Sequence, residues 1–465
     1  MRTERHQPDY ILMIAVLMLT GIGIVTVYSA STVIQLHSGS AADYYAVRQL
    51  GAAIFGLLLF ALTTYMPYHI WYKHAPKLLL ISTLLLLVVL VPGVGHRALG
   101  ATRWLGTSSI HLQPSAVAVV VIVIYLSFLL TRKMTVIHDW RRSFRPAMMV
   151  IVMMTILIII EPDMGTSMAF FATALVLLFA SGIRLRPIIL TLVVMLPAAY
   201  LMAHLASYRK GRLDAFMHPF SNASRSGGGY QLVEGLTGIV NGGLTGRGFD
   251  LSVMATGYLP ESYTDFIFAV FTEQWGWLGD AGLLAIFAVL VWRGFRIARY
   301  APSRFGALMA IGLTSTIVIQ AAINLGAVTW LIPVTGIPLP FISYGGTAIV
   351  INLFSMGILM SISRETGDTV TDVDSLADVV SVEQFRAERS SVGGSASIPG
   401  TGRPAKVASL TRHRAGSWQN ERKREQTRKT DNRRNISLTW KAQQNKPVSG
   451  NNRKNARNND YRNNR

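Results

Sequence analysis

The chain has 465 residues, of which 51% are apolar, and it carries a formal net charge of +20 and no cysteine. The absence of cysteine excludes disulfides and thiolate metal sites. The apolar residues stand in long uninterrupted blocks rather than at the spacing of amphipathic soluble helices, and such blocks are typical of membrane spans about 30 Å long. We therefore expect an integral membrane protein rather than a set of soluble domains.

The apolar blocks predict an all-α fold with ten transmembrane helices. The first block could be a signal peptide, because Arg2 and Arg5 precede it and small residues follow, but nine further blocks favour a retained helix. In chain order the expected spans cover residues 10–28, 47–66, 77–93, 115–131, 146–160, 166–183, 187–204, 266–292, 304–330 and 345–362.

The distribution of basic residues predicts the orientation of these spans. One set of short loops contains 15 lysines and arginines, whereas the opposite set contains only Arg48, Arg97 and Arg103. Basic loops stay in the cytoplasm, so we expect both termini to be cytoplasmic. Residues 205–265, between the seventh and eighth spans, would then form a large extracytoplasmic loop.

The end of the chain differs from the rest in composition. We therefore divide the chain into a membrane domain, residues 1–363, and a tail, residues 364–465. From residue 403 onward the tail has 18 lysines and arginines against four acids and few large apolar residues, which predicts a disordered, basic cytoplasmic segment. It could be simply solvated, or it could bind anionic lipid or an acidic partner. Nucleic acid is not an expected partner, because the aromatic residues are too sparse for base stacking.

Several charged residues fall at the expected outer surface. Asp265 stands where the long loop meets the eighth span, and an ionisable group at the edge of the membrane is a functional candidate. The alternative is that Asp265 caps the helix. Arg103 and Trp104 suit either an interfacial anchor or, for the arginine, a phosphate ligand. Glu161 and Asp163 lie in a tight turn whose proline and glycine explain the turn but not the acids.

The long loop is rich in glycine, with nine glycines between residues 227 and 248. Glycines let backbone amides approach phosphate, but they also permit irregular backbone. No Walker motif, His-Glu-x-x-His sequence or Gly-x-Ser-x-Gly sequence is present, so nucleotide binding, zinc protease and serine hydrolase chemistry have no support. Acids and arginines beside apolar spans suit a lipid-linked pyrophosphate.

Several motifs resemble those of the SEDS family, which comprises the FtsW, RodA and SpoVE proteins, both in their residues and in their order along the chain. The resemblance runs from about residue 10 to residue 363, and its two longest motifs are the most specific. The motifs are Tyr-Ser-Ala-Ser (28–31), Gly-Ala-Thr-Arg-Trp-Leu (100–105), Gln-Pro-Ser (113–115), Pro-Asp-Met-Gly (162–165), Gly-Gly-Leu-Thr-Gly (242–246), Leu-Pro-Glu-Ser-Tyr-Thr-Asp-Phe-Ile-Phe-Ala (259–269) and Thr-Gly-Ile-Pro-Leu-Pro-Phe-Ile-Ser-Tyr-Gly-Gly (335–346).

This resemblance implies a ten-span peptidoglycan glycosyltransferase that polymerises lipid II at the outer face of the cytoplasmic membrane. The family's essential aspartate matches Asp265, which would deprotonate or orient the attacking sugar hydroxyl, or hold a divalent cation such as Mg²⁺ or Mn²⁺. No organic cofactor is expected. The residues that the resemblance assigns to substrate binding are Arg103, Trp104, Asp163, Arg212 and Glu261.

The chain departs from the family pattern at the start of the fourth span. Ala116 and Val119 replace a glutamate and a lysine that the family usually has there. Replacing both partners of an ion pair by apolar residues is often close to neutral, so we assign no function to these two positions.

Other functions remain open at this point. A lipid II flippase is the main alternative to an enzyme, and a non-catalytic scaffold is another. Within the family, the long charged tail and the Tyr-Leu-Pro-Glu stretch at 258–261 favour a division enzyme, located at the septum, over an elongation enzyme that determines cell shape. Family membership also implies a class B penicillin-binding protein as partner, along with other division proteins.

Overall fold

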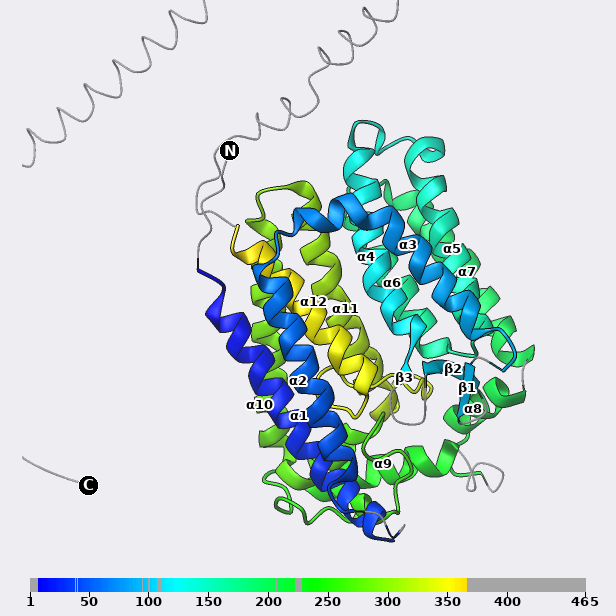
Figure 1. Cartoon of the computed structure of the whole chain (residues 1–465). Helices are drawn as coiled ribbons and strands as arrows, with labels where there is room; N and C mark the ends of the chain where they lie inside the picture. The colour runs from blue at the N-terminus through cyan, green and yellow to red at the C-terminus, as the bar shows by residue number, and fades with distance from the viewer. Residues whose placement is uncertain are drawn as a thin grey trace, which may run out of the picture. The chain divides into compact units, whose positions relative to one another are not determined.

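The structure, a computed structural model, describes residues 7–37, 39, 41–93, 95–98, 101–106, 111–205, 207–221 and 228–365. Almost all of the expected tail, including its basic part, lies outside these residues. The described chain is mainly helical (Figure 1). Its helices are α1 (Tyr10–His37), α2 (Tyr44–Tyr65), α3 (His69–Val89), α4 (Pro114–Arg132), α5 (Arg145–Ile160), α6 (Met164–Ala180), α7 (Leu185–Leu205), α8 (Ser207–Met217), α9 (Gly228–Gly242), α10 (Ile267–Arg299), α11 (Arg304–Val328) and α12 (Gly346–Ser363).

Eight helical segments in the described residues are long and apolar enough to cross a membrane. They are α1 to α4, the segment Trp140–Ile160 that ends with α5, and α10 to α12. Two shorter apolar helices, α6 and the Leu185–Met195 part of α7, correspond to the expected spans 166–183 and 187–204. The helical membrane bundle is thus confirmed, and the count of ten spans remains a prediction.

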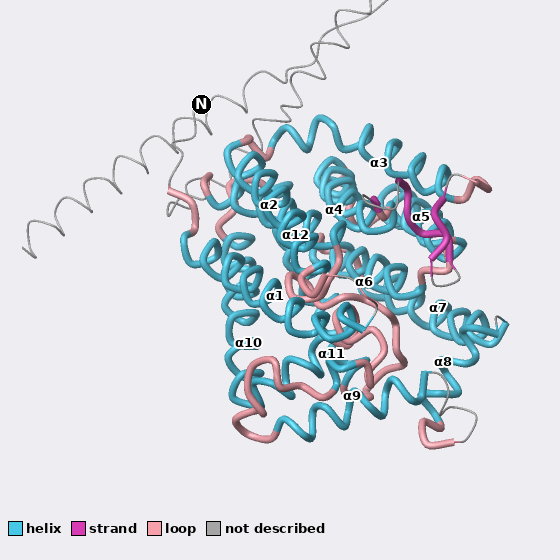
Figure 2. The backbone as a smooth tube through the Cα atoms, turned by 60° about the horizontal axis from the view of Figure 1, so that its bottom comes forward, coloured by secondary structure: helices cyan, strands magenta, loops and turns pink. Residues whose placement is uncertain are grey.

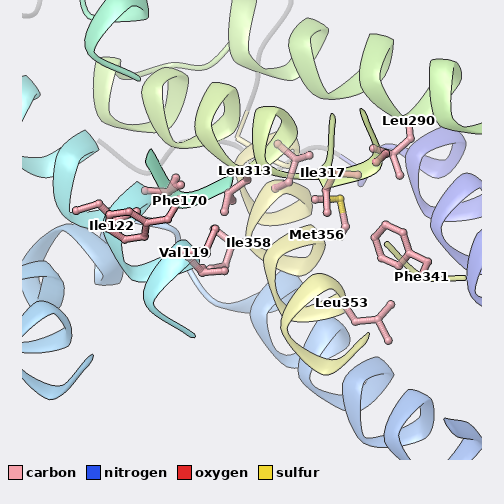
Figure 3. Packing of buried hydrophobic residues seen from close by; sticks show 14 of the residues in the cluster. Val119, Ile122, Phe170, Leu290, Leu313, Ile317, Phe341, Leu353, Met356 and Ile358 are labelled. Atoms are coloured by element: carbon pink, nitrogen blue, oxygen red, sulfur yellow. The ribbon is translucent and has the colours of Figure 1, made fainter. Parts of the chain in front are cut away.

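The centre of the bundle is a continuous apolar core. Figure 3 shows Val119 and Ile122 of α4 together with Phe170 of α6, Leu313 of α11 and Ile358 of α12, and all five side chains are fully or almost fully buried. Val119 stands where the family usually has a lysine, and in this chain it is one more apolar residue of the core. A lysine there would need a buried partner, which agrees with the loss of both charges together.

The two ends of the membrane bundle can be told apart from its contacts. The backbone N–H of Asp9, just before α1, donates to Ser363 Oγ at the end of α12 over 3.3 Å. Arg293, near the end of α10, forms an ion pair of 2.7 Å with the Asp9 carboxylate. Both ends of the described chain therefore lie at one end of the bundle, as an even number of spans requires. Which end faces the cytoplasm remains a prediction.

The opposite end of the bundle carries most of the loops, together with α8 and α9 (Figures 1 and 2). It also carries a three-stranded antiparallel sheet, in which the central strand β2 pairs with both others. The strands are β1 (Gly95–Ala98), β2 (Ala101–Gly106) and β3 (His111–Leu112). This small sheet is an addition to the expected helical fold, and it forms because the connection between α3 and α4 satisfies its backbone groups by strand pairing.

The glycine-rich segment packs against a break in the helical geometry of α10. Gly276 lies inside this helix with φ +65°, a conformation that glycine adopts readily. A Cβ atom at Gly276 would lie 2.3 Å from the backbone nitrogen of Gly246, so the backbones of these two segments are in direct contact. Next to the break, the backbone N–H of Trp277 donates to the carbonyl of Gly243 over 3.0 Å. Gly243 and Gly246 therefore serve irregular backbone, one of the two roles expected for this segment.

Candidate active site

Asp265 lies just before α10, at the end of the bundle that carries the sheet. The N-cap residue of α10 is Phe266, and the structure shows no side-chain capping bond at this end of the helix. The interpretation of Asp265 as a helix cap is therefore wrong. The Thr264 hydroxyl lies 3.2 Å from Asp265 Oδ1 and 2.7 Å from Glu261 Oε2, so it can donate to either carboxylate and links the two.

The surroundings of Asp265 favour its neutral form more than water does. Burial raises the pKa of Asp265 to about 6, and the nearby Glu261 carboxylate adds to this effect, while the Arg212 guanidinium and hydrogen bonds act against it. A carboxylate with a pKa near 6 is still mostly ionised at neutral pH and is a better proton acceptor than an ordinary aspartate. These properties suit a general base.

Arg212 reaches the same place from α8. Its Nη1 donates to the carbonyl of Val334 over 3.1 Å. Gly336 lies beside both charged groups, because a Cβ atom there would lie 3.7 Å from Arg212 Nη1 and 3.8 Å from Asp265 Oδ2. Gly336 has φ +74° and bears no side chain, so this residue places no side-chain atom next to the guanidinium and the carboxylate. The structure thus brings Arg212 and Asp265 together, as predicted for a shared site.

Asn324 of α11 ties two segments of this site together. Its Nδ2 donates to the carbonyl of Asp265 and to the carbonyl of Ile337, both over 2.8 Å. The side chain is almost fully buried, and its Oδ1 has no hydrogen-bond partner among the described residues. Asn324 therefore fixes the position of the Asp265 backbone relative to the loop that contains Gly336.

Aromatic residues hold the same motif from its other side. The ring of Tyr263 stacks on Tyr45 of α2, with 4.5 Å between the ring centroids. The backbone N–H of Tyr344, just before α12, donates to the carbonyl of Tyr263 over 2.9 Å. Residues next to Asp265 are thus anchored to α2 and to the segment that leads into α12, so the catalytic candidate stands on a rigid support.

A second group of charged residues surrounds the turn between α5 and α6. Asp163 caps α6, because its Oδ1 accepts from the backbone N–H of Thr166 over 3.1 Å. Its Oδ2 accepts from Gln113 Nε2 over 2.8 Å and from Ser115 Oγ over 3.1 Å. The structure thus gives Asp163 a structural role in holding the Gln-Pro-Ser segment at the start of α4. Its contact with substrate remains a prediction.

Arg103 and Trp104 lie side by side on β2. The Nη2 of Arg103 donates to the carbonyl of Pro162, and its Nε is buried without a partner among the described residues. Trp104 is half-buried and is paired with His96 in the sheet. The sheet thus positions Arg103 against the turn that contains Asp163, which the linear sequence did not indicate.

The two groups of charged residues share one loop. A Cβ atom at Gly165, beside the Asp163 turn, would lie 2.8 Å from the carbonyl oxygen of Thr335 and 2.7 Å from the Ile337 side chain. Residues 335–337 therefore contact the Asp163 turn and also carry Gly336, which faces Asp265 and Arg212. All six predicted site residues consequently gather around one end of the bundle, in two neighbouring groups.

The described residues include few side chains that could bind a metal ion at this site. The described residues contain no group of three or more histidines, cysteines, aspartates or glutamates that could hold a metal ion. Asp265 and Glu261, linked through Thr264, are two carboxylates at one place. Mg²⁺ in phosphate-processing enzymes is often held by one or two carboxylates together with substrate phosphates, and this pair fits that arrangement.

Sequence reasoning missed Asn324, Gly336 and the burial of Glu161. Asn324 was visible as a polar residue within an apolar span, but Gln320 and several threonines and serines lie in the same span, so the sequence did not single it out. Gly336 was noted only as part of a motif. Glu161 was singled out as unexplained, but the sequence does not show that its carboxylate is completely buried.

The chain is similar to known proteins over most of its length. Residues 10–368 match the family of cell cycle proteins that comprises FtsW, RodA and SpoVE. Stage V sporulation protein E of Bacillus subtilis is 36% identical over 364 residues, which cover 78% of this chain and 99% of that protein. A probable peptidoglycan glycosyltransferase FtsW of Trichlorobacter lovleyi is 36% identical over 356 residues, which cover 76% of this chain and 93% of that protein.

Solved structures show the same fold. One chain from work on a peptidoglycan synthase complex that coordinates polymerization and crosslinking has a TM-score of 0.64 and 25% identity, covering 78% of this chain and 99% of that chain. The rod shape determining protein RodA of Thermus thermophilus has a TM-score of 0.58 and 24% identity, covering 78% of this chain and 98% of that chain. From the motifs, the fold and these matches, the chain belongs to the FtsW/RodA/SpoVE family, also called the SEDS family.

Proposed function

We propose that this chain is a peptidoglycan glycosyltransferase that polymerises lipid II. The observation that carries the proposal is Asp265, a carboxylate with a raised pKa that lies with Arg212 beside Gly336 at one end of a membrane bundle. Relatives named as peptidoglycan glycosyltransferases, 33–36% identical to this chain, support the same activity.

In the proposed reaction, the 4-hydroxyl of one GlcNAc attacks the anomeric carbon of MurNAc on a second lipid II molecule. The new glycosidic bond forms as the bond to the pyrophosphate breaks, and undecaprenyl pyrophosphate leaves with the bonding electrons. Asp265 accepts the hydroxyl proton, a contribution typically about 10²–10⁴-fold in rate. Arg212, which also lies beside Gly336, stabilises negative charge on the pyrophosphate through its guanidinium.

The remaining proposed substrate contacts come from the charged residues around the turn between α5 and α6. Arg103 and Trp104 lie on β2 beside the Asp163 turn, and a guanidinium there suits a phosphate of the lipid-linked substrate. In its alternative role, Asp265 would instead hold a Mg²⁺ or Mn²⁺ ion together with Glu261, and the ion would supply positive charge that offsets the negative charge of the pyrophosphate. We propose no organic cofactor.

The cellular setting of the enzyme is also part of the proposal. The basic loops favour an orientation with both termini in the cytoplasm and Asp265 on the outer side. We propose septal synthesis during division rather than elongation, together with a class B penicillin-binding protein and other division proteins as partners. A chain of a synthase complex that coordinates polymerization and crosslinking has this fold, which supports a partner that crosslinks.

One reconstitution experiment tests the activity. The full chain and a candidate class B penicillin-binding protein are incorporated into liposomes with lipid II and Mg²⁺, and glycan polymer is measured. Asp265→Asn keeps the size of the side chain but removes its charge, and it should abolish polymer. Asp43→Asn is the control, because Asp43 is an exposed acid at the start of α2, and it should retain full activity.

Three outcomes would contradict the proposal. Equal polymer from Asp265→Asn and from the unmodified chain would remove Asp265 from catalysis. Transfer of labelled lipid II across the bilayer without polymer would indicate a flippase. Full polymer synthesis by the penicillin-binding protein when this chain is omitted would leave the chain as a scaffold.

A further inference from the structure

Glu161 is a buried acid that the proposed reaction does not use. It follows α5 directly, its side chain has 0% exposure, and neither of its carboxylate oxygens has a hydrogen-bond partner among the described residues. An ionised carboxylate in such surroundings costs several kcal/mol unless it is paired. The group must therefore carry a proton or be neutralised by a nearby cation.

Arg103 is the cation that acts on Glu161. Its Nη2 already donates to the carbonyl of Pro162, the residue next to Glu161, while its Nε is buried and has no partner in the described part of the chain. An unpaired buried donor and two unpaired buried acceptors of opposite charge are thus close together without a hydrogen bond between them. Each unsatisfied buried polar group costs about 1–3 kcal/mol, so stability is gained when Arg103 and Glu161 bond to each other or when Arg103 binds another acceptor.

Asp163 is the other charged group that acts on Glu161, and it cannot stabilise the ionised Glu161 carboxylate. It carries the same charge, and its oxygens already accept from Thr166, Gln113 and Ser115. Its effect is to make ionisation of Glu161 less favourable. The state of Glu161 is consequently determined by Arg103 on β2, by Asp163 at the start of α6 and by burial.

We infer that Glu161 is a positioning residue that controls Arg103. When Glu161 is protonated, the guanidinium is available to bind a phosphate of the lipid-linked substrate. When Glu161 is ionised, it pairs with Arg103 Nε and competes with that phosphate. The identity of the ligand as a lipid-linked pyrophosphate rests on the proposed function, whereas the pairing of the two side chains does not.

The protonation state near neutral pH fits this role. Burial raises the pKa of Glu161 from its ordinary value of 4.5 to about 8, with repulsion by Asp163 acting in the same direction and attraction by Arg103 acting against it. A phosphate bound to Arg103 would cancel part of that attraction and raise the pKa of Glu161 further. Binding would therefore take up a proton, and affinity would fall as pH rises above 8, by about tenfold between pH 7 and pH 9.

A binding experiment on the full chain in nanodiscs tests this linkage. The probe is a polyprenyl pyrophosphate, whose terminal phosphate has a second pKa near 6 and is ionised from pH 7 to pH 9. The unmodified chain and the control Asp43→Asn should bind the probe about tenfold more weakly at pH 9 than at pH 7. Glu161→Gln, which cannot ionise, should bind it equally at both pH values.

A calorimetric measurement repeats the test without any variant. Titrating the probe into the unmodified chain at pH 8, in two buffers of different ionisation enthalpy, should show uptake of about half a proton per ligand bound. Affinity that does not depend on pH, no proton uptake at pH 8, or an unchanged pH dependence in Glu161→Gln would each overturn the inference.

These measurements need no polymerisation, so the inference and the proposed function can fail separately. Proton-linked binding of the probe by a chain that makes no polymer would support the role of Glu161 and refute the glycosyltransferase. Polymer synthesis accompanied by binding that is independent of pH would do the reverse.

Discussion

Replacing Asn324 by alanine would test whether the position of Asp265 depends on the α11 clamp. The variant removes both hydrogen bonds from Nδ2, to the carbonyls of Asp265 and Ile337, each 2.8 Å long. It changes no group that touches the proposed substrate. Any loss of activity would therefore come from displacement of Asp265 relative to the loop that carries Gly336.

The stability and the activity of this variant should change by different amounts. Two neutral hydrogen bonds contribute together about 1–3 kcal/mol to folding, and their removal also leaves the carbonyls of Asp265 and Ile337 without this donor. Removal of the buried Oδ1, which has no partner among the described residues, gives back about 1–3 kcal/mol. We therefore expect a net loss of at most about 3 kcal/mol and a modest fall in melting temperature. A shift of about 1 Å in a catalytic group reduces rate on the order of 100-fold, and we expect a loss of kcat of that size.

The assay compares polymer formation from lipid II by equal amounts of folded protein, with melting temperature measured in the same nanodiscs. Asn352→Ala is the matched control, since Asn352 is another buried asparagine, on α12. It should retain kcat. Unchanged kcat in Asn324→Ala would refute the clamp, and so would an equal loss of kcat in both variants.

Three further variants test other parts of the structure. Gly336→Ala requires a side chain at φ +74° and places a methyl group 3.8 Å from the carboxylate of Asp265. It should lower kcat in the polymer assay and cost about 1–2 kcal/mol in thermal unfolding, because the left-handed backbone brings Cβ too close to the following carbonyl. Glu273 is fully buried and accepts from Ser252 Oγ and from the backbone N–H of Met254, so Glu273→Ala leaves two buried donors without a partner and should cost about 2–6 kcal/mol, seen as a fall in melting temperature. Because the pKa of Glu161 is raised from 4.5 to about 8, the folded chain binds more protons than the unfolded chain between these values and loses stability as pH rises. The loss is at most about 1.4 kcal/mol for each pH unit. The melting temperature of the unmodified chain should therefore fall relative to that of Glu161→Gln as the pH rises from 5 to 8. A difference between the two melting temperatures that stays constant over this range would contradict the burial of an unpaired carboxylate.

Hydrophobicity predicted the membrane helices because a spanning segment must satisfy its own backbone and present apolar side chains to lipid. The expected spans 146–160 and 304–330 correspond closely to α5 and α11. The third expected span began at residue 77, whereas α3 begins at His69. Its first two turns carry lysine, histidine and proline, which hydropathy does not assign to a membrane helix.

The motifs likewise named Asp265 and Arg212 as candidate site residues, through the family resemblance, and the structure places them close together. What the motifs could not supply is the geometry between them. Gly336 lies beside both groups, and Asn324 fixes the backbone of Asp265 relative to the loop that carries Gly336. Both residues come from parts of the chain far from Asp265 and Arg212. The three-stranded sheet that carries Arg103 was also missed, because its strands are short and carry no alternating apolar pattern.

The sequence by itself thus determined the class of protein and the membrane helices, and through the motifs it named the candidate site residues, because each of these depends on local composition or on a contiguous motif. Only the tertiary structure decided that Asp265 faces Arg212, that α10 breaks at Gly276 against Gly246, and that Glu161 lies buried beside Arg103. These features arise from contacts between residues distant in sequence, and the burial and electrostatic field of a side chain are fixed by the segments that pack around it.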